Sequence, residues 1–208
     1  GNVTFTGAIG ATTGLGGLSV NASSGDGNIT FTSTIGDADT IGVVGTTAVG
    51  NSTTADMDFG GAIYKFDGAT TFTAVSSGTM DMAAAVAFTT AADNIEFATA
   101  GIALANGANL TIDTAAGAGN ITVGGAITGV SVETVTIDAG TGTTSVAAIG
   151  SSTQIGALSI GSSDNGGITL NGAIVTDGAV TIDGPVTLAT GAVSVTTAND
   201  AITFNHSI

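Results

Sequence analysis

Few side chains in this sequence are suited to catalysis. The 208 residues include one lysine, Lys65, and one histidine, His206, with no arginine and no cysteine. A nucleophile–histidine–carboxylate triad needs a buried histidine, whereas His206 lies two residues before the end and is expected at the surface. Lys65, in the stretch IYKF, could act as a base or form an isopeptide bond, but a solvated lysine is the simpler interpretation.

Carboxylates are abundant and cationic side chains are scarce, and this balance bears on two reactions of polysaccharides. Asp and Glu number 16 against one lysine, so the net charge is −15. Polysaccharide lyases commonly use Arg or Lys as the base that removes a proton, and arginine is absent. Glycoside hydrolysis needs only two carboxylates, but one Tyr and no Trp offer little surface for sugar stacking. We predict that the chain is not an enzyme and requires no cofactor.

Paired aspartates make Ca²⁺ the metal to consider, because Ca²⁺ favours carboxylate oxygens on flexible loops. The candidate pairs are Asp37 and Asp39 in GDADT, and Asp56 and Asp58 in ADMDFGG. In addition, the phrase Thr-Ile-Asp recurs and ends in Asp113, Asp138 and Asp183. Stacked like charges repel, and a bound cation would relieve that repulsion. The alternative is that these are solvated carboxylates in turns, where Asp is common.

The acidic composition also limits the partners. Binding to nucleic acid or to anionic lipid requires cationic side chains, so both partners are excluded. No apolar run approaches the roughly 18 residues that a membrane-spanning helix needs, so no membrane insertion is predicted. The sequence does not identify a carbohydrate or host-surface ligand.

A short phrase recurs along the whole chain. A polar turn is followed by an apolar–Thr–apolar strand pattern, and the copies are GNVTFTGAIG (1–10), GNITFTSTIG (27–36), GNITVGGAITG (119–129), GGITLNGAIVTDG (166–178) and NDAITFNHSI (199–208). A second phrase lies between them, as in LGGLSVNASSGDG (15–27), LTIDTAAGAGN (110–120) and VTIDGPVTLATG (180–191). Each ends in Gly, Asp, Asn or Ser, which favour turns. The chain therefore alternates strands with corners.

The alternation within each strand predicts which side chains face the core. Ile29 and Phe31 are expected inside, with Thr30 outside. A repeat of roughly 20–30 residues cannot close a core alone but can stack on its neighbours. We therefore predict that residues 1–208 form a single all-β domain, a β-solenoid of about eight irregular coils with a threonine ladder on one face. A β-sandwich subunit like a pilin is the alternative, and the Ala-rich stretch 82–92 is compatible with a strand or a short helix.

The phrases GNVTFTGAIG, LGGLSVNA and TIDGPVTLATG resemble the repeats of very large bacterial surface adhesins. These are filamentous-haemagglutinin-like and autotransporter-like exoproteins built as right-handed β-helices. The resemblance covers most of the chain and implies secretion, display at the cell surface, and an adhesive or scaffolding role. No segment matches the family's secretion or anchoring regions.

The sequence also contains seven Asn-x-Ser/Thr sequons, which makes the chain a possible glycoprotein. Their asparagines are Asn2, Asn21, Asn28, Asn51, Asn109, Asn120 and Asn205. The alternative is a corner asparagine that happens to precede a strand threonine.

The opening and closing phrases predict how copies would assemble. Neither end has an atypical, polar capping repeat, and open solenoid edges aggregate unless they are capped. We expect an extracellular structural protein that forms a filament, sheath or adhesive stalk by head-to-tail stacking of copies of itself. The same interface would join segments of a longer tandem chain. The expected interface residues are Gly1, Asn2, Val3, Phe5, Ile9, Ile202, Phe204 and Ile208. The alternatives are a donor-strand-exchanging pilin, an S-layer-like subunit and, more remotely, an ice-binding protein that uses the threonine ladder.

Overall fold

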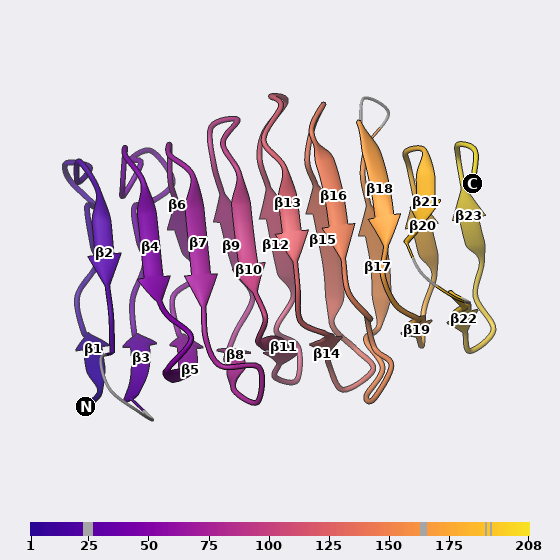
Figure 1. Ribbon diagram of the computed structural model, residues 1–208, viewed down its shortest axis with the longest axis horizontal. Helices are drawn as coiled ribbons and strands as arrows, with labels where there is room; N and C mark the ends of the chain where they lie inside the picture. Colours follow the sequence, from indigo (N-terminus) through magenta and orange to yellow (C-terminus); the bar gives the residue numbers. More distant parts are fainter. Residues whose placement is uncertain (23–26, 163–165, 190, 192) are drawn as a thin grey trace.

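The computed structural model describes residues 1–22, 27–162, 166–189, 191 and 193–208. Their only regular secondary structure is β-strand, and they contain no helix long and apolar enough to cross a membrane. The strands form parallel sheets wound into a β-solenoid of about eight turns, as predicted (Figure 1). The turns lie side by side from the N-terminus to the C-terminus, so the molecule is a rod.

Each turn passes through three sheets, which we name from their positions in Figure 1. The fourth turn, for example, consists of β8 in the basal sheet, β9 in the back sheet and β10 in the front sheet. The basal sheet contains β1 (Val3–Phe5), β3 (Gly27–Phe31), β5 (Thr54–Phe59), β8 (Thr79–Met82), β11 (Gly101–Leu104) and β14 (Ile127–Thr128), continued by β19 (Ile174–Thr176) and β22 (Val195–Thr197).

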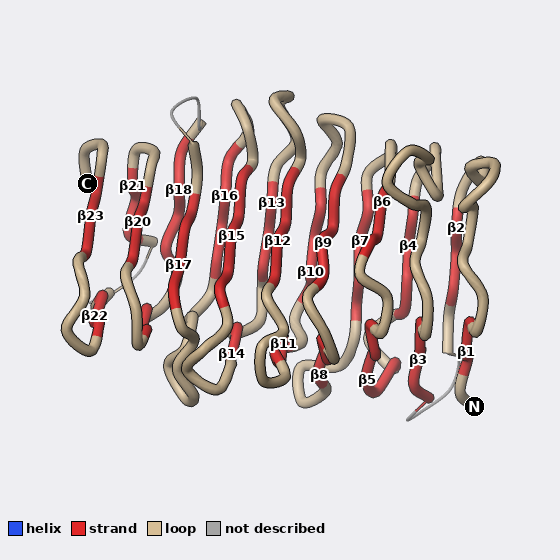
Figure 2. Tube along the Cα trace, turned by 180° about the vertical axis from the view of Figure 1, so that it is seen from behind, coloured by secondary structure: helices blue, strands red, loops and turns tan. Residues whose placement is uncertain are grey.

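The front and back sheets form the two long sides of the rod, and Figure 2 shows them from behind. The front sheet contains β2 (Leu18–Val20), β4 (Thr47–Gly50), β7 (Thr70–Thr73), β10 (Ile95–Ala98), β13 (Ile121–Val123), β16 (Thr143–Val146), β18 (Gly167–Leu170) and β21 (Val186–Leu188). The back sheet contains β6 (Ile63–Lys65), β9 (Val86–Thr89), β12 (Leu110–Asp113), β15 (Thr134–Asp138), β17 (Ala157–Ile160), β20 (Val180–Ile182) and β23 (Ile202–Phe204).

Every strand pairing among the described residues is parallel, and residues at equivalent positions stack in columns along the rod. One inward column of the basal sheet runs through Val3, Ile29, Met57, Met80, Ile102, Ile127, Ile149, Ile174 and Val195. One inward column of the back sheet runs through Ile9, Ile35, Tyr64, Phe88, Ile112, Ile137, Ile160, Ile182 and Phe204. The β-sandwich alternative is therefore wrong, because antiparallel strands would be needed for it.

These inward columns fill the interior. Aromatic rings concentrate in the first four turns, where Phe59 of the basal sheet contacts Phe72 of the front sheet and Phe88 of the back sheet, at ring-centroid distances of 5.3 and 5.1 Å. Isoleucine, leucine and valine fill the later turns. The predicted alternation is confirmed in β3, where Ile29 and Phe31 are buried. The Ala-rich stretch, which was compatible with a strand or a short helix, contains the strand β9, in which Val86 and Phe88 are buried.

The predicted positions of the repeated phrase were wrong. Its copies do not stack on one face: the first two form β1 and β3 of the basal sheet, the copies at 119 and 166 form β13 and β18 of the front sheet, and the last forms β23 of the back sheet. The phrase encodes a turn followed by a half-buried strand, and all three sheets need that pattern. Only the first two copies are therefore one turn apart, and the spacing of the later copies does not equal the length of one turn.

Tyr64 offers a direct test of this interior. Its side chain is completely buried, and its Oη accepts a hydrogen bond from the Gly61 N–H at 3.0 Å. Burial raises the pKa of Tyr64 to about 12, although the Gly61 N–H opposes the rise. Because Tyr64 is the only tyrosine and tryptophan is absent, a phenolate absorbance titration should show one step, with a midpoint near pH 12.

The folded pKa exceeds the unfolded value of about 10, so the neutral phenol favours the folded state. Stability is consequently lost as the pH rises from about 10 through about 12. In denaturant the midpoint should return to about 10. A midpoint of about 10 with an unchanged circular dichroism spectrum would show that water reaches the hydroxyl.

Candidate functional site

Asparagine and aspartate side chains at the starts of strands bind one turn to the next. The Asn2 Oδ1 accepts a hydrogen bond from the Asn28 N–H at 3.0 Å, and the Asn120 Oδ1 accepts one from the Thr143 N–H at 2.8 Å. Asp56, a predicted calcium ligand, does the same with the Thr79 N–H at 2.9 Å. These bonds satisfy backbone donors where the ladder of a strand begins.

The same arrangement bears on the predicted glycosylation sites. Asn109 accepts a hydrogen bond from the Thr134 N–H at 2.8 Å, and Asn94, which is not in a sequon, accepts one from the Asn120 N–H at 2.8 Å. The role in joining turns therefore does not depend on the sequon. The described structure leaves five of the predicted asparagines exposed and two half-buried, namely Asn2, Asn21, Asn109, Asn120 and Asn205, and Asn28 and Asn51. Glycosylation stays a prediction.

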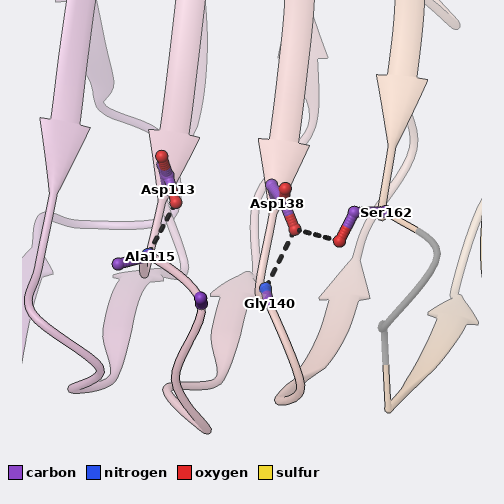
Figure 3. A pocket seen from close by; sticks show the side chains of 6 residues that line it. Asp113, Ala115, Asp138, Gly140 and Ser162 are labelled. Carbon is purple, nitrogen blue, oxygen red and sulfur yellow. Dashed lines mark hydrogen bonds between the residues drawn. The ribbon is translucent and has the colours of Figure 1, made fainter.

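The predicted stack of TID aspartates is partly formed. Asp113 and Asp138 occupy the same position on adjacent turns of the back sheet, while Asp183 lies two turns beyond Asp138. A pocket of about 220 Å³ lies at this edge and is also lined by Gly140 and Ser162 (Figure 3).

Hydrogen bonds within this edge use one oxygen of each carboxylate. The Asp113 Oδ1 accepts from the Ala115 N–H at 2.6 Å. The Asp138 Oδ1 accepts from the Gly140 N–H at 2.9 Å and from the Ser162 hydroxyl at 3.0 Å (Figure 3). Each aspartate thus organises the turn that follows its strand, which is the ordinary structural role of Asp at such positions.

The other predicted calcium ligands lie in two places, Asp37 and Asp39 in a corner and Asp58 in β5. The Asp37 Oδ1 accepts hydrogen bonds from the N–H groups of Asp39 and Thr40 at 2.9 and 2.7 Å, and these bonds lower the pKa of Asp37. Asp58 instead stacks on Asp81 and accepts a hydrogen bond from the Thr30 hydroxyl at 2.8 Å. In the parts of the chain that the structure describes, no three carboxylate or imidazole side chains form a metal-binding group. Calcium binding stays a prediction.

Asp81, which sequence reasoning missed, completes an acidic patch on the basal sheet. Burial raises the pKa of Asp81, and the negative charges of Asp58 and Asp56 raise it further, against a hydrogen bond from the Thr79 hydroxyl. The alternation in TMDM would have placed Asp81 on the outer face, but nothing in the sequence shows that it stacks on Asp58.

Glu133 is a fully buried carboxylate that the sequence analysis did not identify. Its Oε1 accepts a hydrogen bond from the Gly107 N–H at 3.2 Å, and its Oε2 accepts one from the Val130 N–H at 2.7 Å. Burial raises the pKa of Glu133, but bonds from backbone N–H groups outweigh burial, so the pKa lies below its usual value. The carboxylate holds a corner loop in which Ser131 has a φ of 80°, a conformation unfavourable for a residue with a Cβ.

Replacing Glu133 with glutamine should lower the free energy of unfolding by about 2 kcal/mol at pH 7, because hydrogen bonds to a charged acceptor are lost. The folded pKa lies below the unfolded value of about 4.5, so the stabilisation is present above that pH and is lost as the pH falls through the folded pKa. The difference between wild type and variant should therefore shrink in acid. Urea unfolding followed by circular dichroism measures both effects.

Glu96→Gln is the matched control, because it removes the same charge from an exposed position in the front sheet. We expect it to change the free energy of unfolding by less than about 0.5 kcal/mol. Equal effects of the two variants would show that overall charge, rather than the buried hydrogen bonds, determines the result.

Lys65 and His206, the two candidate catalytic side chains, make ordinary surface contacts. The Lys65 Nζ donates a hydrogen bond to the Ala38 carbonyl oxygen at 2.8 Å, across adjacent turns. The His206 Nε2 lies 3.2 Å from the Asp183 Oδ1, and both side chains are partly exposed. The absence of enzymatic activity stays a prediction.

Hydroxyl groups do stack in ladders, although not where the sequence placed them. The longest run on the back sheet is formed by the second phrase and the closing strand, through Thr111, Thr136, Ser159, Thr181 and Thr203. A similar run on the front sheet contains Thr122, Ser145, Thr169 and Thr187. The opening threonine, Thr4, stacks only on Thr30 before Asp58 interrupts its column.

Both ends of the rod expose apolar side chains and strand edges. Among the described residues, β1 and β2 at one end and β22 and β23 at the other each pair with a single neighbouring strand. Of the exposed large apolar side chains, four lie on these end turns: Leu15, Leu188, Ile202 and Ile208. Val3, Phe5, Ile9 and Phe204 are half-buried and pack against the core from the ends.

No protein family, curated protein or solved structure matches this chain. The solenoid architecture follows from the strand pairing alone. The two end edges differ from the rest of the rod surface in their unpaired strand edges and exposed apolar side chains.

Proposed function

We propose that this chain is a non-enzymatic extracellular structural protein, a β-solenoid whose copies stack head to tail into a filament, sheath or adhesive stalk. The observation that carries the proposal is the parallel stacking of the described turns, because each inward column could continue from the last turn of one copy, or of one segment in a longer tandem chain, into the first turn of the next. Unpaired strand edges expose backbone donors and acceptors together with apolar side chains, and pairing with another chain satisfies both. The resemblance to adhesin repeats supports the location and the adhesive role.

The inward columns define how two copies would join. Continuing the basal column places Val3 of the next copy on Val195 of the first, and continuing the back column places Ile9 of the next copy on Phe204 of the first. The Val186 N–H donates to the Ser207 carbonyl oxygen at 2.9 Å, so Ile208 begins another row of the front sheet. Leu18 of the next copy would lie on that residue. Such a contact is head to tail and does not close, so it propagates.

The sheet positions of the terminal strands give the proposed interface a register different from direct stacking of the opening phrase on the closing phrase. The opening strand β1 belongs to the basal sheet and the closing strand β23 to the back sheet. In a continuous rod, β1 pairs with β22, whose Val195 is absent from the predicted interface. The predicted residues Ile202 and Phe204 contact the segment around Ile9 instead.

Disulfide trapping tests this register, because the chain has no cysteine of its own. Thr4 and Thr196 are exposed, lie on the outer face of the basal sheet, and would be neighbours across the junction. Stacked parallel strands lie about 4.8 Å apart, within reach of a disulfide. Oxidising a Thr4→Cys/Thr196→Cys double variant should give a ladder of covalent multimers on a non-reducing gel.

The control pairs Thr4→Cys with Thr203→Cys, which would be neighbours only if the opening phrase stacked on the closing phrase. We expect that pair to remain largely monomeric. Multimers from the control pair alone would contradict the register, and a lack of multimers from both pairs would contradict the head-to-tail proposal.

A further inference from the structure

Three asparagines in this chain precede a glycine, and the structure places two of these pairs in different surroundings. The pairs are Asn106–Gly107, Asn165–Gly166 and Asn171–Gly172, of which Asn165 lies outside the described residues. An Asn–Gly pair can convert spontaneously into a succinimide, because the glycine nitrogen can attack the side-chain amide carbon and the glycine has no Cβ to hinder the approach. The surroundings of each pair determine how readily that attack occurs in the folded chain.

The pair Asn171–Gly172 is fixed to the preceding turn. The Asn171 Nδ2 donates hydrogen bonds to the Ser145 Oγ at 3.0 Å and to the Val146 carbonyl oxygen at 3.2 Å. The backbone of Gly172 lies so close to the preceding turn that a Cβ at this position would be 2.7 Å from the Ala148 N. Hydrogen bonds therefore hold the amide carbon, and packing holds the nitrogen that would attack it.

The pair Asn106–Gly107 forms an exposed turn between β11 and β12. The Ala108 N–H donates to the Ala105 carbonyl oxygen at 2.8 Å, and Gly107 has a φ of 77°, which suits glycine. A Cβ at Gly107 would meet no atom within 4 Å. Among the described residues, the Asn106 side chain has no hydrogen-bond partner. Asn106 is therefore free to turn towards the Gly107 nitrogen, and water reaches both residues.

One contact restrains this turn. The Gly107 N–H donates to the Oε1 of Glu133, a completely buried carboxylate, at 3.2 Å. Ring closure requires that the Gly107 nitrogen leaves this acceptor and loses its proton. A hydrogen bond to a charged acceptor is costly to break, and a neighbouring carboxylate disfavours the negative charge of a deprotonated nitrogen. Glu133 should therefore slow the attack without preventing it.

We propose that Asn106 is a site of spontaneous modification, at which the chain forms a succinimide and then aspartate or isoaspartate, and that Glu133 restrains this reaction. The Gly107 nitrogen loses its proton to water and attacks the Asn106 Cγ. The N–Cγ bond forms, the Cγ–Nδ2 bond breaks, and Nδ2 takes up a proton and leaves as ammonia.

Water then opens the succinimide ring in one of two ways. Addition at Cγ breaks the N–Cγ bond and gives aspartate at position 106. Addition at the backbone carbonyl carbon of residue 106 breaks its bond to the Gly107 nitrogen and gives isoaspartate. Isoaspartate lengthens the backbone of this corner by one methylene, and the corner joins two turns through Glu133 and through the Thr134 N–H, which donates to the Asn109 Oδ1. The modification goes beyond the head-to-tail proposal and does not depend on it.

Hydroxylamine tests the site, because it cleaves a chain at a succinimide. We expect the folded wild type in neutral hydroxylamine to give the fragments 1–106 and 107–208, identified by their masses. Cleavage after Asn171 should be at least about tenfold slower, because two hydrogen bonds must first break. Cleavage after Asn165 gives fragments of different mass and does not enter the comparison. Asn106→Gln is the control for the site, since glutamine would need a larger ring, and both fragments should disappear.

Glu133→Gln tests the restraint. We expect cleavage after Asn106 to become about tenfold faster, because the Gly107 N–H then meets a neutral acceptor. Cleavage after Asn171 should stay unchanged, which separates a local effect from unfolding of the whole chain. Glu96→Gln removes the same charge from an exposed position and should change neither rate.

Two sets of results would contradict the proposal. A folded wild type that is not cleaved after Asn106, or is cleaved there no faster than after Asn171, would overturn the assignment of the site. Unchanged or slower cleavage after Asn106 in Glu133→Gln, or an equal increase at both asparagines, would overturn the restraint by Glu133. None of these results bears on the disulfide trap of the head-to-tail interface.

Discussion

Replacing Phe59 with alanine should lower the free energy of unfolding by about 5 kcal/mol, at the upper end of the range for buried aromatic residues. The side chain is completely buried, and its ring lies 5.1 Å from those of Tyr64 and Phe88 and 5.3 Å from that of Phe72. These three rings come from the back and front sheets, so the variant loses packing among all three sheets.

The consequence should extend beyond one side chain, because each turn of a solenoid is stabilised mainly by its neighbours. A cavity in the third turn weakens the contacts that join the first two turns to the rest. Urea unfolding followed by circular dichroism measures the loss. The fluorescence of Tyr64, the only tyrosine in a chain without tryptophan, reports the same region.

Phe5→Ala is the matched control for this prediction. Phe5 is half-buried on the first turn, and its ring stacks on that of Phe31 at 5.0 Å. We expect the free energy of unfolding to fall by about 1–2 kcal/mol, because folding removes less apolar area from water at Phe5 than at Phe59. Similar losses in the two variants would contradict the central position of Phe59 in the core.

The faces of the strands could be predicted from sequence because they depend on a local rule. In a strand, alternate residues point to opposite sides, so the burial of Ile29 and Phe31 follows from a few neighbouring residues. The parallel solenoid could be predicted as well, because a short strand-and-turn unit repeated many times buries its apolar side only by stacking.

The assignment of strands to sheets could not be predicted, because it depends on the length of every corner. Corner lengths vary from turn to turn, and similar phrases such as GNITF and AITF occupy the basal and back sheets. The role of Glu133 was hidden for a related reason. Its partner Gly107 is 26 residues away, and only the stacking of turns brings that N–H to the carboxylate.

The same stacking makes Asp56 and Asn109 equivalent. In sequence, an aspartate pair suggests a cation, and an asparagine two residues before a threonine suggests a glycan. In the structure, both side chains accept a hydrogen bond from a backbone N–H of the following turn. Residue type alone did not distinguish these roles, because a carboxylate oxygen and an amide oxygen are equally able to accept that hydrogen bond.

Replacing Val195 with aspartate should abolish head-to-tail assembly. In the proposed junction, Val195 enters the inward basal column beneath Val3 of the next copy, so the variant would place an unpaired carboxylate in an apolar interior. A cost of about 3 kcal/mol or more raises the concentration needed for assembly at least about 100-fold. Sedimentation and negative-stain microscopy would measure this change.

Thr196→Asp provides the control, because it adds the same charge one residue away on the exposed face of β22. It should assemble at nearly the wild-type concentration. Circular dichroism separates loss of assembly from loss of folding, since both positions lie on the last turn and the preceding turns keep their neighbours. Equal behaviour of the two variants would place the junction elsewhere.

Mixing the Val195→Asp variant with wild type gives the sharper form of this prediction. The variant keeps an intact first turn, so it can still add to the growing end of a filament through Val3 and Phe5. Its last turn then accepts no further copy, and growth stops at that point. With one variant in about ten subunits, the mean length should fall to about ten subunits, because each variant ends one chain. A merely inactive subunit would instead leave filament length unchanged, so the length distribution distinguishes a head-to-tail polymer from side-by-side aggregation.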